Sequence, residues 1–489
     1  MKTDAHWKPI GFHPHHGICL PLSALRTQKS CGTGEFLDLI PLIDWCKSLH
    51  LDCIQLLPLN DSGSDPSPYN PLSSCALDPI YLSLSDLNIP PFDAPHSRLE
   101  VLHQKLALLR THFTSTFPAL SRTPRYRAFV EQNPWLESYS HFKALKDLFN
   151  GQNCHDWPSP TPTLPRAAID FYSYLQFHCF DQLERVRAHA TSQHVFLKGD
   201  IPILLSPDSV DVWVHPNLFR LDLEAGAPPD NYNRLGQKWG FPLFNWEVMR
   251  KTGYVWWKQR LKIAEKFFHI YRIDHVVGFF RIWGIPKDNQ PTDGSFFPPD
   301  RSLWVPQGKE HLEMFLNASP LLPIAEDLGT IPKEVYPVLK ELGICGTKVI
   351  RWQKEDDHFI PFHEYEPFSM TTVSTPDLAP LELWWKKVPA ESVPFAQFMH
   401  WTYHPILTND QRFAILRASH HTSSIFHINL LQEYLALFPE LVWPNPEEEQ
   451  INIPGTILPN NWTYRFRPSL EEIVAHEGLR AAFARILAQ

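Results

Sequence analysis

Short apolar runs alternate along the chain with longer segments that are apolar on one face only. Short runs bounded by polar residues are typical of buried strands, whereas apolar residues three or four positions apart indicate helices. The strands predicted in this way cover residues 17–22, 53–57, 195–205, 269–277, 321–325, 347–352 and 370–374. The helical pattern covers residues 36–49, 247–269 and 331–342. Gly343 closes the third of these helices, and a capping box from Ser469 to Glu472 opens the last helix of the chain.

The alternation of strands and helices predicts a parallel sheet. About seven such strands in a chain of 489 residues favour an α/β fold of the closed (β/α)8 TIM-barrel type over an open sheet. We therefore interpret residues 1–489 as a single barrel whose extra length lies in its βα loops. Residues from about 61 to 193 are too many for a simple loop and are predicted to form an inserted subdomain. Smaller insertions are expected at about 204–246 and 284–318.

Charge and cysteine usage exclude several classes of protein. The net charge is −9 and there is no long basic run, which argues against nucleic acid as a partner. No apolar stretch reaches the roughly 18 residues that predict a membrane span, and the first residues lack the apolar core of a secretory signal. Eight scattered cysteines without a CxxC pair are typical of free thiols, so we expect a cytoplasmic protein.

Histidine and proline usage adds two expectations. The 25 histidines form no HExxH or similar ligand pattern, and the run from His13 to His16 is interpreted as a loop and not as a metal site. The 47 prolines are about twice the usual share, which indicates many stiffened loops. No pattern in the chain favours a particular oligomeric state.

Four of the predicted strands end in an acidic residue. These residues are Asp200, Asp274, Glu326 with its neighbour Asp327, and Asp377. In a barrel the carboxyl ends of the strands meet at one mouth, where the chemistry of such folds takes place. A single acid at such a position can simply cap the next helix, but four together predict a shared site.

Arg272 adds a charge to this group of acids. It lies two residues before Asp274 on a predicted strand, so both side chains point to the same face. A neighbouring arginine lowers the pKa of an acid and keeps it ionised. An ionised acid opposite a protonated one is the arrangement of a retaining glycosidase. The alternative is a structural bridge between Arg272 and Asp274.

Two polar loops carry the residue types that bind sugars. Aromatic faces cover the C–H side of a pyranose ring, while amides and acids bind its hydroxyl groups. One loop is Ser67-Pro-Tyr69-Asn70, and the other runs from Gly236 to Gly240 with Gln237 and Trp239 inside it. Trp239 is predicted to be exposed because glycines flank it in a polar segment.

In these residues the chain resembles the 4-α-glucanotransferases, which are also called amylomaltases or disproportionating enzymes and form glycoside hydrolase family 77. The matching blocks follow the family's order along nearly the whole chain. They are Ser67-Pro-Tyr-Asn70, Gly199-Asp-Ile-Pro-Ile203, Asp211-Val-Trp213, Gly226-Ala-Pro-Pro-Asp230, Gly236-Gln-Lys-Trp-Gly240, Tyr271-Arg-Ile-Asp-His275, Ala325-Glu-Asp-Leu-Gly329, Asn452-Ile-Pro-Gly-Thr456 and Asn461-Trp462.

The resemblance implies a single catalytic barrel without a C-terminal β-sandwich, and transfer of an α-1,4-glucan segment with retained configuration. It implies that Asp274 is the nucleophile, Glu326 the general acid and base, and that Asp377 binds and distorts the sugar. Arg272 would orient Asp274. Further substrate contacts implied by the resemblance are Ser67, Tyr69, Asp200, Gln237, Trp239, His275 and Asn461. The implied partners are malto-oligosaccharides and glucose, extending to glycogen or starch-type glucans. No metal or organic cofactor is implied.

The chain departs from the family at one position of this site. The family pattern before the third acid is His-Asp, whereas this chain has Pro376-Asp377. The missing imidazole would bind hydroxyl groups of the transferred sugar, and a lost charge-assisted hydrogen bond costs roughly 1.5–3 kcal/mol. His275 or His363 is a candidate to fill the same place.

Two other functions remain open at this point. The first is an α-glucan hydrolase, in which water replaces the sugar acceptor in the same chemistry. The second is a catalytically weakened glucan-binding protein, which only Pro376 favours and which the presence of all three acids opposes.

Overall fold

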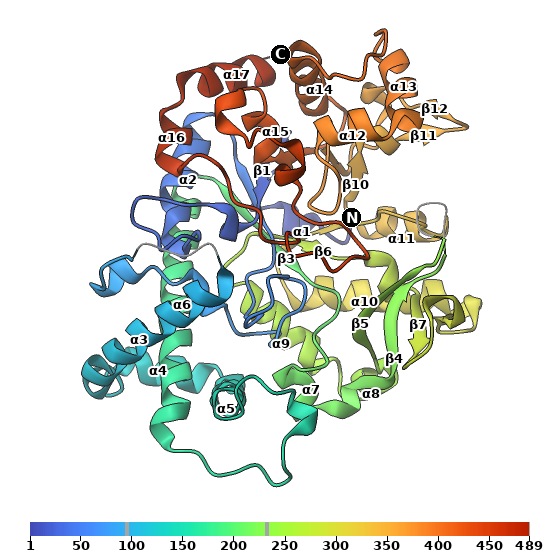
Figure 1. The fold of residues 1–489 in the computed structure, drawn as a ribbon. Coiled ribbons are helices and arrows are strands. Elements are labelled where there is room, and N and C mark those ends of the chain that lie inside the picture. Colours follow the sequence, from blue (N-terminus) through green and yellow to red (C-terminus); the bar gives the residue numbers. More distant parts are fainter. Residues whose placement is uncertain (93–96, 230–233, 489) are drawn as a thin grey trace.

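Eight parallel strands form the centre of the molecule (Figure 1). The structure, a computed structural model, describes residues 1–92, 97–229 and 234–488. The strands are β1 (His15–Leu20), β2 (Cys53–Leu56), β3 (Phe196–Ile201), β6 (Ile270–Ile273), β9 (Leu322–Ala325), β10 (Gly346–Val349), β13 (Ser369–Thr372) and β14 (Phe426–Leu430). They neighbour one another in chain order, and β14 pairs with β1. Between β9 and β10 a parallel bridge joins Ile324 to Cys345, which brings the sheet round into a barrel. The predicted (β/α)8 fold is confirmed.

The predicted strands begin within a few residues of the observed ones. The predicted ranges 195–205 and 269–277 extend past the ends of β3 and β6. The eighth strand, β14, was missed because His427 and Asn429 interrupt its apolar run. Both polar side chains are buried, and the Asn429 Oδ1 accepts a hydrogen bond from the Val373 N–H at 2.8 Å. β1 begins at His15, so the interpretation of this stretch as a loop is wrong for His15 and His16.

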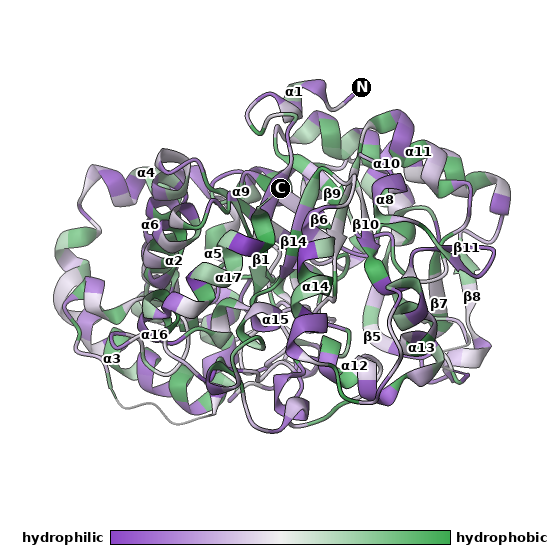
Figure 2. Cartoon of the chain, turned by 90° about the horizontal axis from the view of Figure 1, so that it is seen from above, coloured by the Kyte–Doolittle hydropathy of each residue, from purple (hydrophilic) through white to green (hydrophobic). Residues whose placement is uncertain are grey.

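Helices surround the barrel and are shorter than the periodic pattern suggests. Their bounds are α1 (Asp4–Trp7), α2 (Leu39–Ser48), α3 (Arg98–Leu120), α4 (Pro124–Gln132), α5 (Trp135–Leu148), α6 (Arg166–Ser192), α7 (Val210–Val214), α8 (Trp246–Lys251), α9 (Val255–Ala264), α10 (Trp304–Ala318), α11 (Val335–Leu342), α12 (Leu381–Lys387), α13 (Pro389–Phe398), α14 (Asn409–His420), α15 (Leu431–Leu435), α16 (Leu470–Ala475) and α17 (Glu477–Leu487). No helix among the described residues is both long and apolar enough to cross a membrane. Figure 2 shows hydrophilic positions on helices on all sides of the barrel.

Two predicted helices have to be corrected. The long helix expected over residues 247–269 is two helices, α8 and α9, because Gly253 (φ 66°) and Tyr254 (φ 56°) adopt left-handed backbone conformations between them. The capping box of Ser469 is present, but it opens α16, and α17 follows as the last helix. Gly343 ends α11 with a φ of 75°, as predicted.

The connections after β2, β3, β6 and β10 carry additional structure. Helices α3 to α6 lie between β2 and β3 and gather on one side of the barrel (Figure 1). A separate antiparallel sheet has the order β5 (Gln237–Phe244), β4 (Phe219–Ala227), β7 (Ile282–Pro286) and β8 (Ser295–Phe297), and a small hairpin joins β11 (Lys354–Glu355) to β12 (His358–Phe359). β5 brings Gln237 and Trp239 to the barrel mouth, where both line the pocket described below.

Candidate active site

The carboxyl ends of neighbouring strands bring the predicted acids together. Asp200 is the penultimate residue of β3, Asp274 directly follows β6, and Glu326 directly follows β9. Asp377 lies in the loop after β13. All four acids line one pocket of about 470 Å³ at the mouth of the barrel. The strand-end pattern in the sequence therefore located a real cluster.

Arg272 of β6 connects three of these acids. Its Nη1 donates to both carboxylate oxygens of Asp200 (2.8 and 2.9 Å) and to Oδ1 of Asp274 (2.8 Å). Its Nη2 lies 3.7 Å from Oε2 of Glu326. Burial disfavours the charged guanidinium, but the surrounding carboxylates outweigh it and raise the pKa of Arg272 well above its usual range.

Asp274 is held by two donors on opposite oxygens. Arg272 donates to Oδ1, and the backbone N–H of Ile203 donates to Oδ2 at 3.1 Å. Both donors stabilise the ionised carboxylate and fix its direction. The side chain is 17% exposed, so it still faces the pocket. This is the environment expected of an ionised acid that keeps lone pairs available to a ligand.

Glu326 has a different environment from Asp274. Its two oxygens accept hydrogen bonds from the backbone N–H groups of Leu328 and His275, both at 2.9 Å. Burial raises its pKa to about 7; Arg272 opposes this rise, and the charge of Asp274 adds to it. A group that is about half protonated near neutral pH can both donate and accept a proton. The two carboxyl groups thus have different surroundings, and Glu326 is the one suited to carry a proton.

Asp377 and Pro376 form another wall of the pocket. Asn452 donates from Nδ2 to Oδ1 of Asp377 at 2.7 Å, while burial raises the pKa of Asp377. His363 is not a substitute for the missing family histidine, because its side chain is 80% exposed and lies outside the pocket lining. His275 does line the pocket, and burial lowers its pKa to about 4, so its imidazole is neutral at pH 7.

Aromatic side chains frame the acids on two sides. The Tyr69 hydroxyl donates to Asp200 at 2.7 Å, and its ring lies 5.3 Å from that of Trp462. On the other side, Trp239 lies edge-on to His275 with ring centroids 5.2 Å apart. Trp239 is half-buried and its indole N–H donates to Gln237 Oε1 at 3.0 Å. The pocket thus combines aromatic faces with acids and amides, which are the groups that bind sugars.

Two predicted contacts do not reach the pocket. Ser67 accepts a hydrogen bond from the Tyr69 N–H at 3.3 Å and is absent from the lining. Asn461 is buried and binds its own loop, donating to the Thr456 carbonyl at 3.0 Å and accepting from the Ile453 N–H at 3.3 Å. Both side chains shape loops that other residues use.

Asn452 and Trp462 also line the pocket, although neither is among the site residues predicted from the sequence. The signal was present, because each belongs to a block that carries the family resemblance. What the sequence lacked was the direction of each side chain within its loop. Asp230, the last residue of the 226–230 block, lies outside the described residues.

Comparison with known proteins identifies the family of the chain. Residues 20–471 match the glycoside hydrolase family 77 profile, described as 4-alpha-glucanotransferase. The 4-alpha-glucanotransferases of Chlamydia caviae and Chlamydia pneumoniae are each 43% identical to this chain, covering 99% of it and 96% and 98% of their own lengths. The amylomaltase of Streptococcus agalactiae, solved in complex with acarbose, superposes with a TM-score of 0.82 at 23% identity over 97% of this chain and 98% of its own. The chain belongs to the 4-α-glucanotransferase family, glycoside hydrolase family 77, and is an enzyme of that activity.

Proposed function

We propose that this 4-α-glucanotransferase works by a double displacement in which Asp274 and Glu326 perform the chemistry. The observation that carries the proposal is the position of Arg272, which contacts both carboxyl groups while their environments differ. Asp274 accepts hydrogen bonds from Arg272 and from the backbone N–H of Ile203, whereas burial raises the pKa of Glu326 to about 7. A nucleophile and a proton donor placed side by side on neighbouring strands fit a retaining mechanism.

In the first step, an oxygen of Asp274 attacks the anomeric carbon of the donor glucan. The bond from that carbon to the glycosidic oxygen breaks, and Glu326 gives its proton to the departing oxygen. The product is a β-glucosyl ester on Asp274 and a shortened glucan. Because a protonated Glu326 is neutral, it also does not repel the ionised nucleophile.

In the second step, the 4-hydroxyl of glucose or of another glucan attacks the same carbon. Glu326, now a carboxylate, takes the proton of that hydroxyl, and the ester bond to Asp274 breaks. Both acids return to their starting states, and two inversions leave the configuration retained. Asp377 binds ring hydroxyls of the sugar that is transferred, and its hydrogen bond from Asn452 holds it in place.

The remaining pocket residues bind the glucan. Tyr69 and Trp239 supply aromatic faces, and Gln237 and His275 supply polar atoms beside Trp239. Asp200 holds Arg272 through two hydrogen bonds. For Ser67 and Asn461 we propose an indirect role, because each orders a loop that carries a lining residue.

The same observations support three coarser proposals. Malto-oligosaccharides and glucose fit a pocket of this size and lining, and longer glycogen or starch-type glucans would extend from it. All eight cysteines are free and buried, which supports a cytoplasmic location. We also propose that residues 1–489 form one catalytic barrel, with an inserted subdomain at about 61–193 and insertions at about 204–246 and 284–318.

Maltotriose separates transfer from hydrolysis. The wild-type enzyme is expected to convert it into glucose and a series of longer malto-oligosaccharides while the number of reducing ends stays constant. A hydrolase would raise that number in step with glucose release. Chromatography of the products and a reducing-end assay on the same samples give the answer, with Asp274→Asn as the inactive control. A rise of one reducing end per bond cleaved would contradict the proposal.

A further inference from the structure

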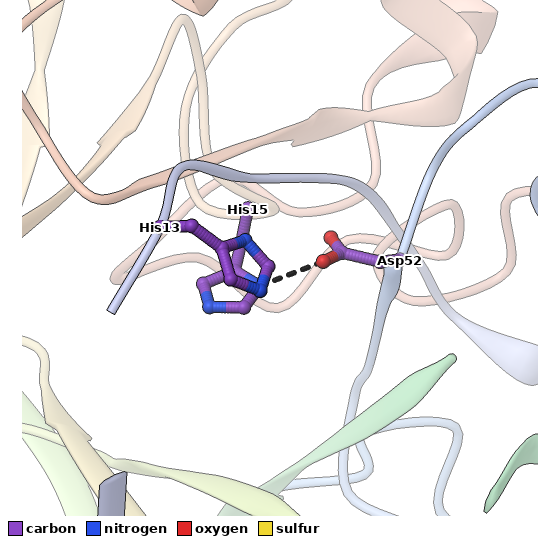
Figure 3. Close-up of side chains that lie close together, drawn as sticks. All are labelled: His13, His15 and Asp52. Carbon is purple, nitrogen blue, oxygen red and sulfur yellow. Dashed lines mark hydrogen bonds and ion pairs between the residues drawn. The ribbon is translucent and has the colours of Figure 1, made fainter. Parts of the chain in front are cut away.

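Two histidines and a carboxylate lie close together away from the acids' pocket, and Figure 3 shows their side chains. His15 is the first residue of β1, and Asp52 directly precedes β2. Parallel strands begin at the same end of a sheet, so this group lies at the amino ends of the strands. His13, His15 and Asp52 each offer a nitrogen or oxygen atom, and these three atoms lie within 4.8 Å of one another.

The pairing of β1 with β2 produces this arrangement. The Asp52 N–H donates to the His16 carbonyl at 2.9 Å, which places Asp52 beside the start of β1. His13 and His15 are two positions apart, and their ring centroids are 4.2 Å apart. The sequence alone shows two histidines near each other, but only the strand register adds the carboxylate.

Two of the three side chains are already oriented. Oδ2 of Asp52 lies 2.7 Å from Nδ1 of His15, while Oδ1 accepts the backbone N–H of His16 at 3.0 Å. The His15 ring stacks on Phe426 with centroids 4.8 Å apart and an interplanar angle of 19°. Such supporting contacts fix ligand directions in metal sites and lower the cost of ordering them.

The charge and exposure of the group suit a cation. His15 is buried, whereas Asp52 is 25% exposed and His13 is exposed, so one side is open to solvent. The one ion pair recorded for Asp52 within the described residues is with His15, and no lysine or arginine pairs with it there. The carboxylate charge is therefore free of a permanent cationic partner.

We propose that His13, His15 and Asp52 form a binding site for a divalent transition metal of the Zn²⁺ class. Imidazole nitrogens and a carboxylate are ligands of zinc, whereas Mg²⁺ and Ca²⁺ prefer oxygen ligands throughout. Ligands at the usual zinc distance of about 2.0–2.2 Å lie roughly 3.4 Å apart in a tetrahedron. Small side-chain movements bring the three atoms to that spacing. Water takes the remaining position, and the ion links the segment before β1 to the start of β2.

Titration of Zn²⁺ into the full-length protein, first treated with a chelator, tests the proposal. Calorimetry is expected to show one saturable Zn²⁺ site per chain and no site for Mg²⁺. Co²⁺ is expected to fill the same site and to give the visible absorption bands of a four-coordinate ion. Neither readout depends on the proposed transfer activity, so failure here leaves the assignment of Asp274 and Glu326 standing.

Three variants assign the ligands. His13→Ala and Asp52→Asn are expected to weaken Zn²⁺ binding at least about tenfold and to abolish the cobalt bands. His363→Ala removes another exposed histidine and should bind like the wild type. The proposal is overturned if the wild type shows no saturable Zn²⁺ binding, if His13→Ala and Asp52→Asn bind as the wild type does, or if His363→Ala weakens binding equally.

Discussion

Two buried cations of this protein, Lys105 and Arg272, have very different surroundings. Lys105 of α3 donates all three of its protons, to Glu35 (2.6 Å) and to the carbonyls of Ile80 (2.7 Å) and Leu82 (2.8 Å). Arg272 at the barrel mouth faces the carboxyl groups of Asp200, Asp274 and Glu326. Lys105 and Glu35 are essentially inaccessible, whereas Arg272 is 13% exposed toward the pocket.

The two clusters differ in whether they offer polar groups to a ligand. Lys105 forms an ion pair with Glu35 and leaves no unused proton. A second acid, Asp38, is buried beside them, and burial and the charge of Glu35 raise its pKa to about 7. None of the three lines the pocket, so the cluster joins α3 to the loop after β1 and offers nothing to a ligand. The acids around Arg272 outnumber it, and burial together with the charge of Asp274 pushes Glu326 toward its protonated form. A buried ion pair that faces no pocket is structural, whereas several acids gathered around one cation in a pocket indicate chemistry.

The largest effect is expected from removing the charge of Asp274. Asp274→Asn keeps the shape of the side chain but cannot form the glycosyl ester, so kcat for maltotriose disproportionation should fall by about 10⁴-fold or more. The fold should be retained, as circular dichroism and thermal unfolding would show. Transfer activity within tenfold of the wild type would show that another residue is the nucleophile.

The next effect concerns the buried pair of Lys105 and Glu35. Lys105→Met leaves Glu35 buried without its partner and should lower the free energy of unfolding by about 3–5 kcal/mol. Urea titration measures this loss, and the fraction that stays folded should keep the wild-type kcat. The double variant Lys105→Met with Glu35→Gln should recover part of the loss. Equal free energies of unfolding for Lys105→Met and the wild type would show that the pair of Lys105 and Glu35 does not stabilise the fold.

Glu326 tests the cluster that has a surplus of acids. Its pKa in the folded protein is about 7, above the usual value of 4.5, so the folded state binds this proton more tightly. That contribution to stability is complete below about pH 4.5 and is lost as the pH rises through 7. Glu326→Gln has no such loss. Its free energy of unfolding, relative to that of the wild type, should therefore rise by roughly 1–3 kcal/mol between pH 5 and pH 8. Urea titrations of both proteins at the two pH values check this.

The same proton sets the alkaline side of the activity profile. Because Glu326 must be protonated to release the first product, kcat/KM of the wild type should decline as the pH rises past about 7. A flat profile up to pH 9 would contradict the role of Glu326 as the acid.

The smallest effect is expected at Pro376. It lines the pocket beside Asp377, at the position where the family resemblance implies a histidine. Pro376→His adds a donor that acts mainly in the transition state, so kcat should rise up to about tenfold with little change in KM. Thermal unfolding of the same variant shows whether the loop tolerates the change. A stable variant with unchanged kcat and kcat/KM would show that the place is already filled, and His275, which lines the same pocket, is the candidate.

The barrel and its acids could be predicted because both depend on local pattern. Apolar runs mark the strands, and Asp274 and Glu326 follow directly where β6 and β9 end. β14 escaped because buried polar residues such as Asn429 are satisfied by distant partners, which a periodicity cannot show. The break between α8 and α9 depends on the backbone of Gly253 and Tyr254.

Side-chain direction within loops was the other missing piece. Asn452 and Asn461 belong to neighbouring blocks of the same segment, yet one points to Asp377 and the other back to its own loop. The meeting of His13 and His15 with Asp52 depends on the register of β1 and β2. Sequence patterns place residues on elements, but contacts between elements decide which of them share a site.

The seam of the barrel lies next to Glu326, the proposed general acid, and this has a consequence for local opening. β9 and β10 share one bridge, and the Ala325 N–H donates to the Cys345 carbonyl at 2.7 Å. The carboxylate of Asp327 supplements this seam by accepting the Thr347 N–H at 2.6 Å, and Gly346 leaves room for it. In amide hydrogen exchange, the amides of Ala325 and Thr347 should therefore be less protected than those of β2 and β3. The barrel is thus expected to open locally first between β9 and β10, beside Glu326.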